Sequence, residues 1–249
     1  MPVRGNGHCS ISHGLQMICN FRFSGSRPLL GAFVVLLGAA MWYVPDIAAA
    51  PVCAPTSMIK VVTRQELPGV DTDAFLRAPK TLYRQGTQFG RLQEHLNPKT
   101  NIKLLIVVDE PNVWVANLEA GTGQYIRDPG PTFNFRAQVF GERGVQSEFV
   151  RDLEIGCEVS ALRAAGAKES KMDHATLGPV TRLEHSVDSE RLVLLVGSNG
   201  NPLRLELHKQ DKHVYTLHYD EFQTGLKLDP ALFTKPSGIA FDREPQPGK

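Results

Sequence analysis

The chain has 249 residues, of which 42% are hydrophobic and 21% charged, and its 27 basic and 26 acidic side chains give a net charge of +1. This balance provides no electrostatic basis for binding nucleic acid or an anionic membrane surface. Once an N-terminal leader is set aside, about 200 residues remain, enough for one domain with a sizeable core.

The N-terminal region has the three parts of a secretory signal peptide. Arg22 and Arg27 form a basic flank, PLLGAFVVLLGAAMWYV is an uncharged apolar run, and DIAAA supplies small residues. Pro45 and Asp46 end the apolar run short of the about 20 residues that span a bilayer. We therefore predict cleavage after Ala49 and a periplasmic location. The alternative is a leader that stays uncut and anchors the protein in the membrane.

Two cysteines, Cys53 and Cys157, follow the predicted leader. In an oxidising compartment they could pair and tie the N-terminus of the processed chain to the middle of the domain. The alternative is two unpaired thiols. Processing hardly changes the charge, because the leader holds three basic residues and one acid, which leaves 24 basic and 25 acidic residues.

Strand patterns follow residues 54–79, a proline-containing stretch that predicts a short helix or loop. TLYRQG and FGRLQE are short strand candidates around a turn, and IKLLIVVDEP is apolar on both faces, as in a strand covered on each side. VWVANL follows, and LEAGTG is typical of a hairpin turn. TFNFRAQVF alternates between apolar and polar residues. These patterns predict a run of successive strands.

Residues 147–165 break the strand pattern and predict one helix, with Ser147 as N-cap and Gly166 as the stop. Since a helix on an open sheet needs only one apolar stripe, a second stripe indicates that this helix is covered twice. The two stripes lie on nearly opposite sides and consist of Val150, Leu153, Cys157, Ala161 and Ala164, and of Ile155, Val159 and Leu162. The predicted solvated edge of the helix consists of Asp152, Glu154 and Glu158.

The strands then resume with short connections. VTRLEHSV, RLVLLVG, PLRLELHK and HVYTLHYDEF are joined by turns too short for crossover helices, so we expect an antiparallel meander. The stretch DPALF has an acid at the N-cap and a proline at the first helical position, which predicts a single helical turn that Leu232 and Phe233 pin to the core. The acids around His218 are therefore interpreted as structural rather than catalytic.

The sequence contains no motif for a nucleophile or a nucleotide. G-x-S-x-G, H-E-x-x-H, the P-loop lysine and the dinucleotide fingerprint are all missing, so we predict no enzyme activity and no cofactor. His208 and His213 flank a turn and could meet across a hairpin, but the histidine spacing does not predict a metal site. An unrecognised hydrolase that uses His218 remains a further alternative.

The strands carry more apolar residues than one helix is expected to cover. The ordinary interpretation is a packed α+β core. The two-striped helix favours a helix in the hollow of a curved sheet, with apolar side chains facing a groove that could take an acyl chain. Because each buried methylene contributes about 0.8 kcal/mol, a long acyl chain would bind there without polar contacts.

Three stretches, TLYRQGTQFGRLQE, EPNVWVANLEAGTG and FQTGLKLDPALFTKPSG, together resemble the family of outer-membrane lipoprotein carriers, over roughly residues 80 to 240. The resemblance implies a half-open antiparallel barrel that binds lipid or lipoprotein acyl chains without catalysis. Arg91 matches the strand arginine that holds the lid in the carriers, and Trp114 matches their hairpin tryptophan. Glu110-Pro111-Asn112 departs from the family's Asp-Gly turn, which leaves the lipoprotein-transfer role open.

The predicted fold is therefore α+β, a curved antiparallel sheet (half-open barrel) with helices packed over its concave face. The predicted divisions are a signal peptide at 1–49, an N-terminal helix/loop segment at 50–79, a half-barrel domain at 80–241 and a disordered tail at 242–249. The predicted ligand-binding residues are Arg91, Leu104, Ile106, Trp114, Phe133, Phe135, Ile155, Val159, Leu162 and Leu194.

Two functions of different kinds follow. The leading hypothesis is a monomeric, non-enzymatic envelope protein that holds a lipid or lipoprotein acyl chain in the groove. The alternative is an envelope stress-sensing or protein-interaction module of the same fold, whose cavity is filled by its own side chains and whose partner is an envelope protein.

Overall fold

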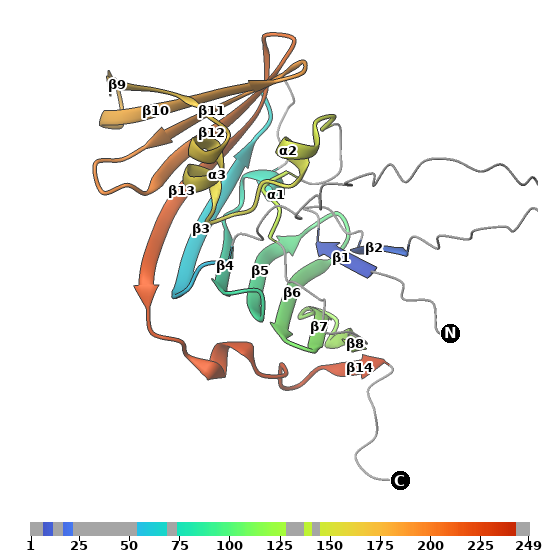
Figure 1. Cartoon of the computed structure of the whole chain (residues 1–249). Helices are drawn as coiled ribbons and strands as arrows, with labels where there is room; N and C mark the ends of the chain where they lie inside the picture. The colour runs from blue at the N-terminus through green and yellow to red at the C-terminus, as the bar shows by residue number, and fades with distance from the viewer. Residues whose placement is uncertain are drawn as a thin grey trace, which may run out of the picture.

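The computed structural model describes residues 7–11, 17–21, 54–68, 74–127, 137–140 and 145–242, and one large antiparallel sheet dominates it (Figure 1). A separate two-stranded sheet pairs β1 (Gly7–Ile11) with β2 (Met17–Phe21). The strands of the large sheet are β3 (Met58–Glu66), β4 (Lys80–Gln85), β5 (Phe89–Asn97), β6 (Ile102–Asp109), β7 (Asn112–Asn117), β8 (Thr122–Arg127), β9 (Lys168–His174), β10 (Gly178–Val187), β11 (Glu190–Val196), β12 (Pro202–Lys209), β13 (Lys212–Leu226) and β14 (Ala240–Asp242).

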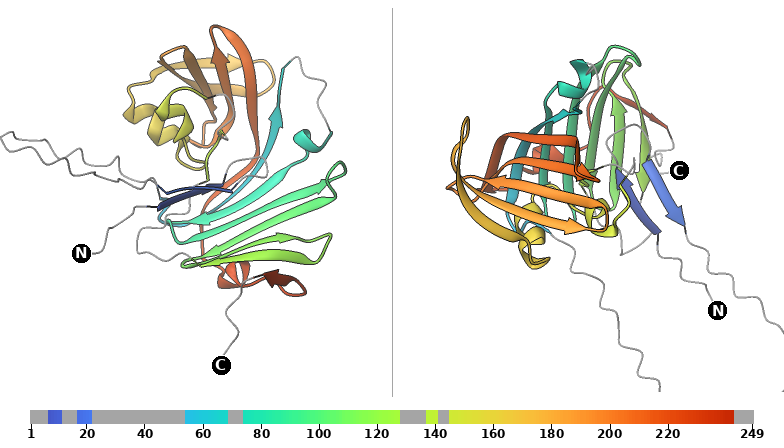
Figure 2. Two further views of the ribbon diagram at one scale, coloured as in Figure 1. Left: turned by 90° about the vertical axis from the view of Figure 1, so that its right-hand side faces the viewer. Right: turned by 90° about the horizontal axis from the view of Figure 1, so that it is seen from above.

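The large sheet is curved and does not close. Its 12 strands have the order β14-β8-β7-β6-β5-β4-β3-β13-β12-β11-β10-β9. All neighbouring pairs are antiparallel except β14 with β8, which is parallel. Figure 2 shows the sheet bending around β3 and β13, so that β9–β12 and β4–β8 form two halves with one shared concave side. The predicted antiparallel, curved and unclosed sheet is therefore confirmed.

The prediction of a helix or loop over residues 54–79 is wrong in its first half. β3 lies there, in the middle of the sheet between β4 and β13. Its residues alternate in burial, with Ile59 and Val61 turned to the core. The prolines flank the strand and do not interrupt its ladder, so they are no obstacle to pairing. The sheet domain therefore begins before residue 80, and α1 (Ala74–Arg77) is a short connector.

The helix predicted over residues 147–165 is two short helices, α2 (Glu148–Arg151) and α3 (Glu158–Ala164). The predicted ends are confirmed: the Ser147 side chain accepts a hydrogen bond from the Val150 amide, and Gly166 ends the helix with φ of 76°. Between the helices, the Ile155 amide donates to the Ala137 carbonyl (2.7 Å). Residues 153–155 thus bond to another part of the chain, and Gly156, with φ of 94°, turns the chain into α3.

The helices on the concave side are therefore much smaller than predicted. α2 has four residues and α3 seven, and most of the chain that covers this face is irregular. We call residues 145–167 the inner segment. No helix among the described residues is long and apolar enough to cross a membrane. The apolar run and the cleavage site of the predicted leader lie outside the described residues.

The predicted turn near the C-terminus is confirmed as the 3-10 helix η1 (Pro230–Phe233). The Asp229 side chain accepts a hydrogen bond from the Ala231 amide (3.0 Å), and Phe233 is buried. We call residues 227–242 the C-terminal strap. The strap ends in β14, which extends the sheet beside β8.

Candidate functional site

The predicted binding groove corresponds to the concave side of the sheet, and the protein's own inner segment occupies it. One apolar core joins inward-facing strand residues such as Leu82 and Leu217 to residues of the inner segment. The inner-segment residues buried in this core are Val150, Leu153, Ile155 and Leu162. The helices are short, but their apolar side chains still cover the sheet.

Six of the predicted ligand-binding residues meet in this core: Leu104, Ile106, Ile155, Val159, Leu162 and Leu194. Ile106, Ile155, Leu162 and Leu194 are each at most 3% exposed, whereas the other two are partly buried. These six side chains therefore share one apolar cluster, and their contact with a ligand stays a prediction. They belong to one packed cluster, however, rather than to the walls of an open groove.

Two further predicted residues lie on the opposite, convex side. Trp114 belongs to a second core that also contains Tyr125 and Val107, because successive strand residues point to opposite faces. Arg91 Nη1 donates a hydrogen bond to the Leu232 carbonyl in the C-terminal strap (3.0 Å), and burial lowers the pKa of Arg91. Neither side chain contributes to the concave core. Phe133 and Phe135 lie outside the described residues.

A buried ion pair fixes the inner segment to the sheet. Arg84 of β4 is fully buried, and its Nη2 lies 2.5 Å from Glu154 Oε2. Its Nη1 donates a hydrogen bond to the Ile155 carbonyl (3.2 Å). A charged pair in an apolar core needs such partners, since burial without them is costly. Arg84 therefore binds both the side chain and the backbone of the inner segment.

A buried carboxyl group forms a second connection between the inner segment and the sheet. Glu158, the first residue of α3, is 1% exposed. The Tyr219 hydroxyl of β13 donates to Glu158 Oε1 (2.7 Å), and the Gly156 amide donates to Oε2 (2.9 Å). Burial raises the pKa of Glu158 to about 7, although these hydrogen bonds act in the opposite direction. Burial also raises the pKa of Tyr219.

These polar contacts contradict the predicted solvated edge of the helix. Glu154 and Glu158 are 3% and 1% exposed, and only Asp152 of the three acids is partly open. The sequence does hold a signal for Arg84, because it lies two residues after Leu82 on a strand and must share its inward face. A buried arginine requires buried acceptors, so this pattern predicts inward-facing acids elsewhere in the chain.

Gly156 brings the inner segment close to β3. Gly156 has a φ of 94°, which favours glycine, and a Cβ added there would lie 2.5 Å from Ile59 Cδ1, so the Ile59 side chain would have to shift. Cys157, the next residue, is disulfide-bonded. Cys53, its predicted partner, lies outside the described residues, so the Cys53–Cys157 pair stays a prediction.

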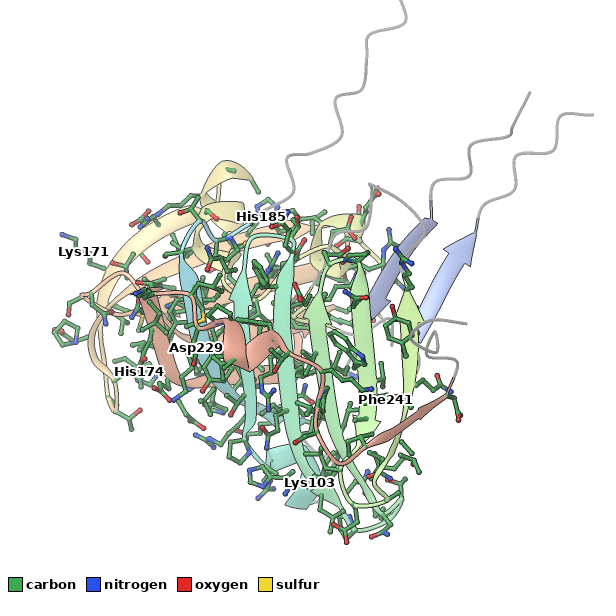
Figure 3. All side chains as sticks on the ribbon, turned by 90° about the horizontal axis from the view of Figure 1, so that it is seen from below. Lys103, Lys171, His174, His185, Asp229 and Phe241 are labelled. Carbon is green, nitrogen blue, oxygen red and sulfur yellow. The ribbon has the colours of Figure 1, made fainter. Side chains whose placement is uncertain are left out.

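The C-terminal strap covers the convex face of β5–β8, as Figure 3 shows between the labelled Asp229 and Phe241. The Phe233 ring packs on Phe89 with 5.3 Å between ring centroids. A Cβ added at Gly123 of β8 would lie 2.6 Å from Phe241, so the missing side chain makes room for this ring. The strap thus closes the second core from outside.

The charged residues around His218 form pairs with side chains of β3. Arg64 Nε donates a hydrogen bond shared by the two carboxylate oxygens of Asp220 (2.8 Å each), and His218 Nε2 lies 3.0 Å from Glu66 Oε2. The rings of His208 and His213 stack across the predicted hairpin at 5.0 Å. Within the described ranges, no group of three or more histidine, cysteine or acidic side chains could hold a metal ion.

Two surface cavities lie in the described part of the chain, and Val196 of the concave core is part of the lining of the larger one. The larger, about 640 Å³, lies near the sheet edge at β9–β11 and includes Lys171, Val180 and Arg163 of α3 in its lining. The smaller, about 280 Å³, lies between residues 54–56 and 85–89. None of the predicted ligand-binding residues lines either cavity.

Comparison with known proteins leaves the family open. No protein-family model and no curated protein matches the chain. An uncharacterized conserved protein from Thermus thermophilus is 12% identical, with a TM-score of 0.43 over 76% of this chain and 91% of that one. MucB in complex with MucA(peri) is 11% identical, with a TM-score of 0.36 over 74% of this chain and 56% of that one. PNGF-II is 10% identical, with a TM-score of 0.33 over 75% of this chain and 31% of that one. Likenesses at this level define neither a family nor a function.

Proposed function

We propose that this chain is a non-enzymatic, extracytoplasmic module that binds a protein partner, with its concave side filled by the inner segment. One observation carries the proposal: the apolar residues expected to contact an acyl chain are closed off by one another. Ile106, Ile155 and Leu162 are at most 3% exposed. An interaction module whose cavity is filled by its own side chains is the second of the two functions that the sequence suggests.

The energetics of the inner segment support a filled concave side. An acyl chain would have to displace side chains such as Ile155 and Leu162, each of which contributes about 1.5–3 kcal/mol when fully buried. It would also have to part Arg84 from Glu154, and a buried charge left without its partner costs about 3–5 kcal/mol. The inner segment is therefore a strong competitor for the groove.

The extracytoplasmic location rests on two independent observations. The sequence has a leader-like N-terminus. Cys157 is disulfide-bonded, and disulfides persist mainly in oxidising compartments outside the cytoplasm. Both support a protein that works in the cell envelope.

The buried polar groups support a structural rather than a catalytic role. Glu158 and Tyr219 are an acid and a hydroxyl in hydrogen-bond contact, the arrangement that proton transfer needs. Both side chains are at most 7% exposed, so a substrate could not reach them in this arrangement. His218, the residue of the hydrolase alternative, pairs with Glu66 on the other face.

A second candidate function is binding of a lipid or acyl chain at β6–β8. Leu104, Val115 and Ile126 face the concave side there and are only partly buried. This row of apolar side chains is therefore partly open. An apolar ligand that leaves the inner segment in place would contact this row.

Native mass spectrometry of protein purified from its host envelope tests the two functions against each other. The proposal expects the bare mass of the processed chain, no saturable binding of a fluorescent fatty-acyl probe, and one discrete protein adduct after cross-linking in cells. Lipid bound near 1:1, with no protein adduct, would overturn it. The matched variants Leu104→Ala and Leu162→Ala locate any probe binding, because only Leu104 belongs to the partly open row.

A further inference from the structure

Glu158 is buried where three parts of the fold meet. Arg84 faces it from β4, Tyr215 and Tyr219 belong to β13, and Glu154 belongs to the inner segment. Arg84 is already paired with Glu154. An ionised Glu158 would therefore be a second negative charge beside a single positive one.

The contacts of Glu158 connect the start of α3 to the preceding turn and to the sheet. Its carboxyl group holds the Gly156 amide on one side and the Tyr219 hydroxyl on the other. α3 has only seven residues, and its N-cap, Cys157, makes no side-chain capping bond. Glu158 is thus a main polar anchor at the start of this helix, and a change in its charge acts directly on the junction between inner segment and sheet.

We propose that the inner segment is a proton-dependent latch, in which protonated Glu158 keeps the concave side closed and ionised Glu158 loosens residues 153–162. This inference rests on the proposed function, because it assigns a regulation to the filled concave side. Loosening exposes Ile155 and Leu162, and with them the apolar face of the sheet. The latch would make that face accessible to a partner or ligand at higher pH.

The direction and size of the effect follow from the two environments of the carboxyl group. The pKa of Glu158 is 4.5 when exposed and about 7 when buried, so its contribution to closure is complete below pH 4.5 and is lost as the pH rises to 7. Between pH 6 and pH 8, the equilibrium constant for closure should fall about 10-fold. Above pH 8 the fall levels off, because Glu158 is then ionised in both states.

Amide hydrogen exchange at a series of pH values, corrected for intrinsic exchange rates, tests the latch on the full processed chain. We expect protection of residues 153–162 to fall about 10-fold between pH 6 and pH 8. Glu158→Gln keeps the shape of the side chain without its charge and should abolish this fall. Glu148→Gln is the matched control, because the side chain of Glu148 is 83% exposed. The difference between wild type and Glu158→Gln removes the contribution of histidine titration.

An equal fall in Glu158→Gln, no fall in the wild type, or a fall spread evenly over the strands would each overturn the latch. If Glu158→Gln does not fold, Tyr219→Phe replaces it. Loss of the Tyr219 hydroxyl removes a bond that favours the anion, so the pH at which protection stops falling should move upward. These results are independent of the native mass measurement, so the latch and the proposed function fail separately.

Discussion

Replacement of Phe233 by alanine tests whether the C-terminal strap is an integral part of the domain. The Phe233 side chain is 1% exposed and packs on Phe89. Loss of a fully buried phenylalanine costs about 3–5 kcal/mol, which includes about 0.5–1.5 kcal/mol from the aromatic pair. We therefore expect Phe233→Ala to lower the free energy of unfolding by about 3–5 kcal/mol.

Urea unfolding followed by tryptophan fluorescence measures this loss of stability and reports on the core beneath the strap. Trp114 is the only tryptophan that follows the predicted leader, and it lies in the core that the strap covers. Phe233→Ala should lower the midpoint and shift the native emission to longer wavelength. Thr234→Ala, at an exposed neighbouring position, is the control and should change stability by less than about 1 kcal/mol. A loss below about 1 kcal/mol for Phe233→Ala, with unchanged emission, would refute the anchoring role.

Three further changes test the inner segment. Gly156→Ala should lower the melting temperature by several degrees, because its Cβ would lie 2.5 Å from Ile59 Cδ1 at a φ of 94°; an unchanged value in calorimetry would contradict this close approach. Burial raises the pKa of Glu190, but the backbone amides that donate to its carboxylate, including that of Ser147, lower the pKa overall. Glu190→Gln should therefore lower the free energy of unfolding by about 1.5–3 kcal/mol at pH 7. Urea titrations should show a progressively smaller loss below pH 4.5. Reduction of the Cys157 disulfide should cost about 2–5 kcal/mol, and a mass shift on alkylation only after reduction would identify the bond.

Local patterns predict most of the sheet, because alternate residues of a strand face the core and the solvent. β12 is an example, since Leu205 and Leu207 are buried and Arg204 and Glu206 are not fully buried. β9 was not predicted, because its residues, KESKMDH, face solvent almost throughout and show no apolar alternation. Its pairing with β10 makes it a strand.

The inner segment illustrates where local reasoning fails. Its apolar residues recur at helical spacing, which predicts an unbroken helix over residues 147–165. The chain instead bonds residues 153 and 155 to residues 139 and 137, and Gly156 redirects it. Glu154 and Glu158 then face Arg84 and Tyr219, partners that are distant in the chain. Such pairing decides whether an acid is solvated or buried.

The amino-acid sequence alone determined the charge balance, the leader-like N-terminus, most strands other than β3 and β9, and the turn that begins at Asp229, since each depends on neighbours within a few residues. Only the tertiary structure decided on which side of the sheet each apolar side chain is buried. Trp114 packs under the C-terminal strap, and Ile155 packs in the concave core. It also decided that the concave side is filled. The physical reason is that burial and the protonation of Glu158 depend on long-range packing, which no local spacing encodes.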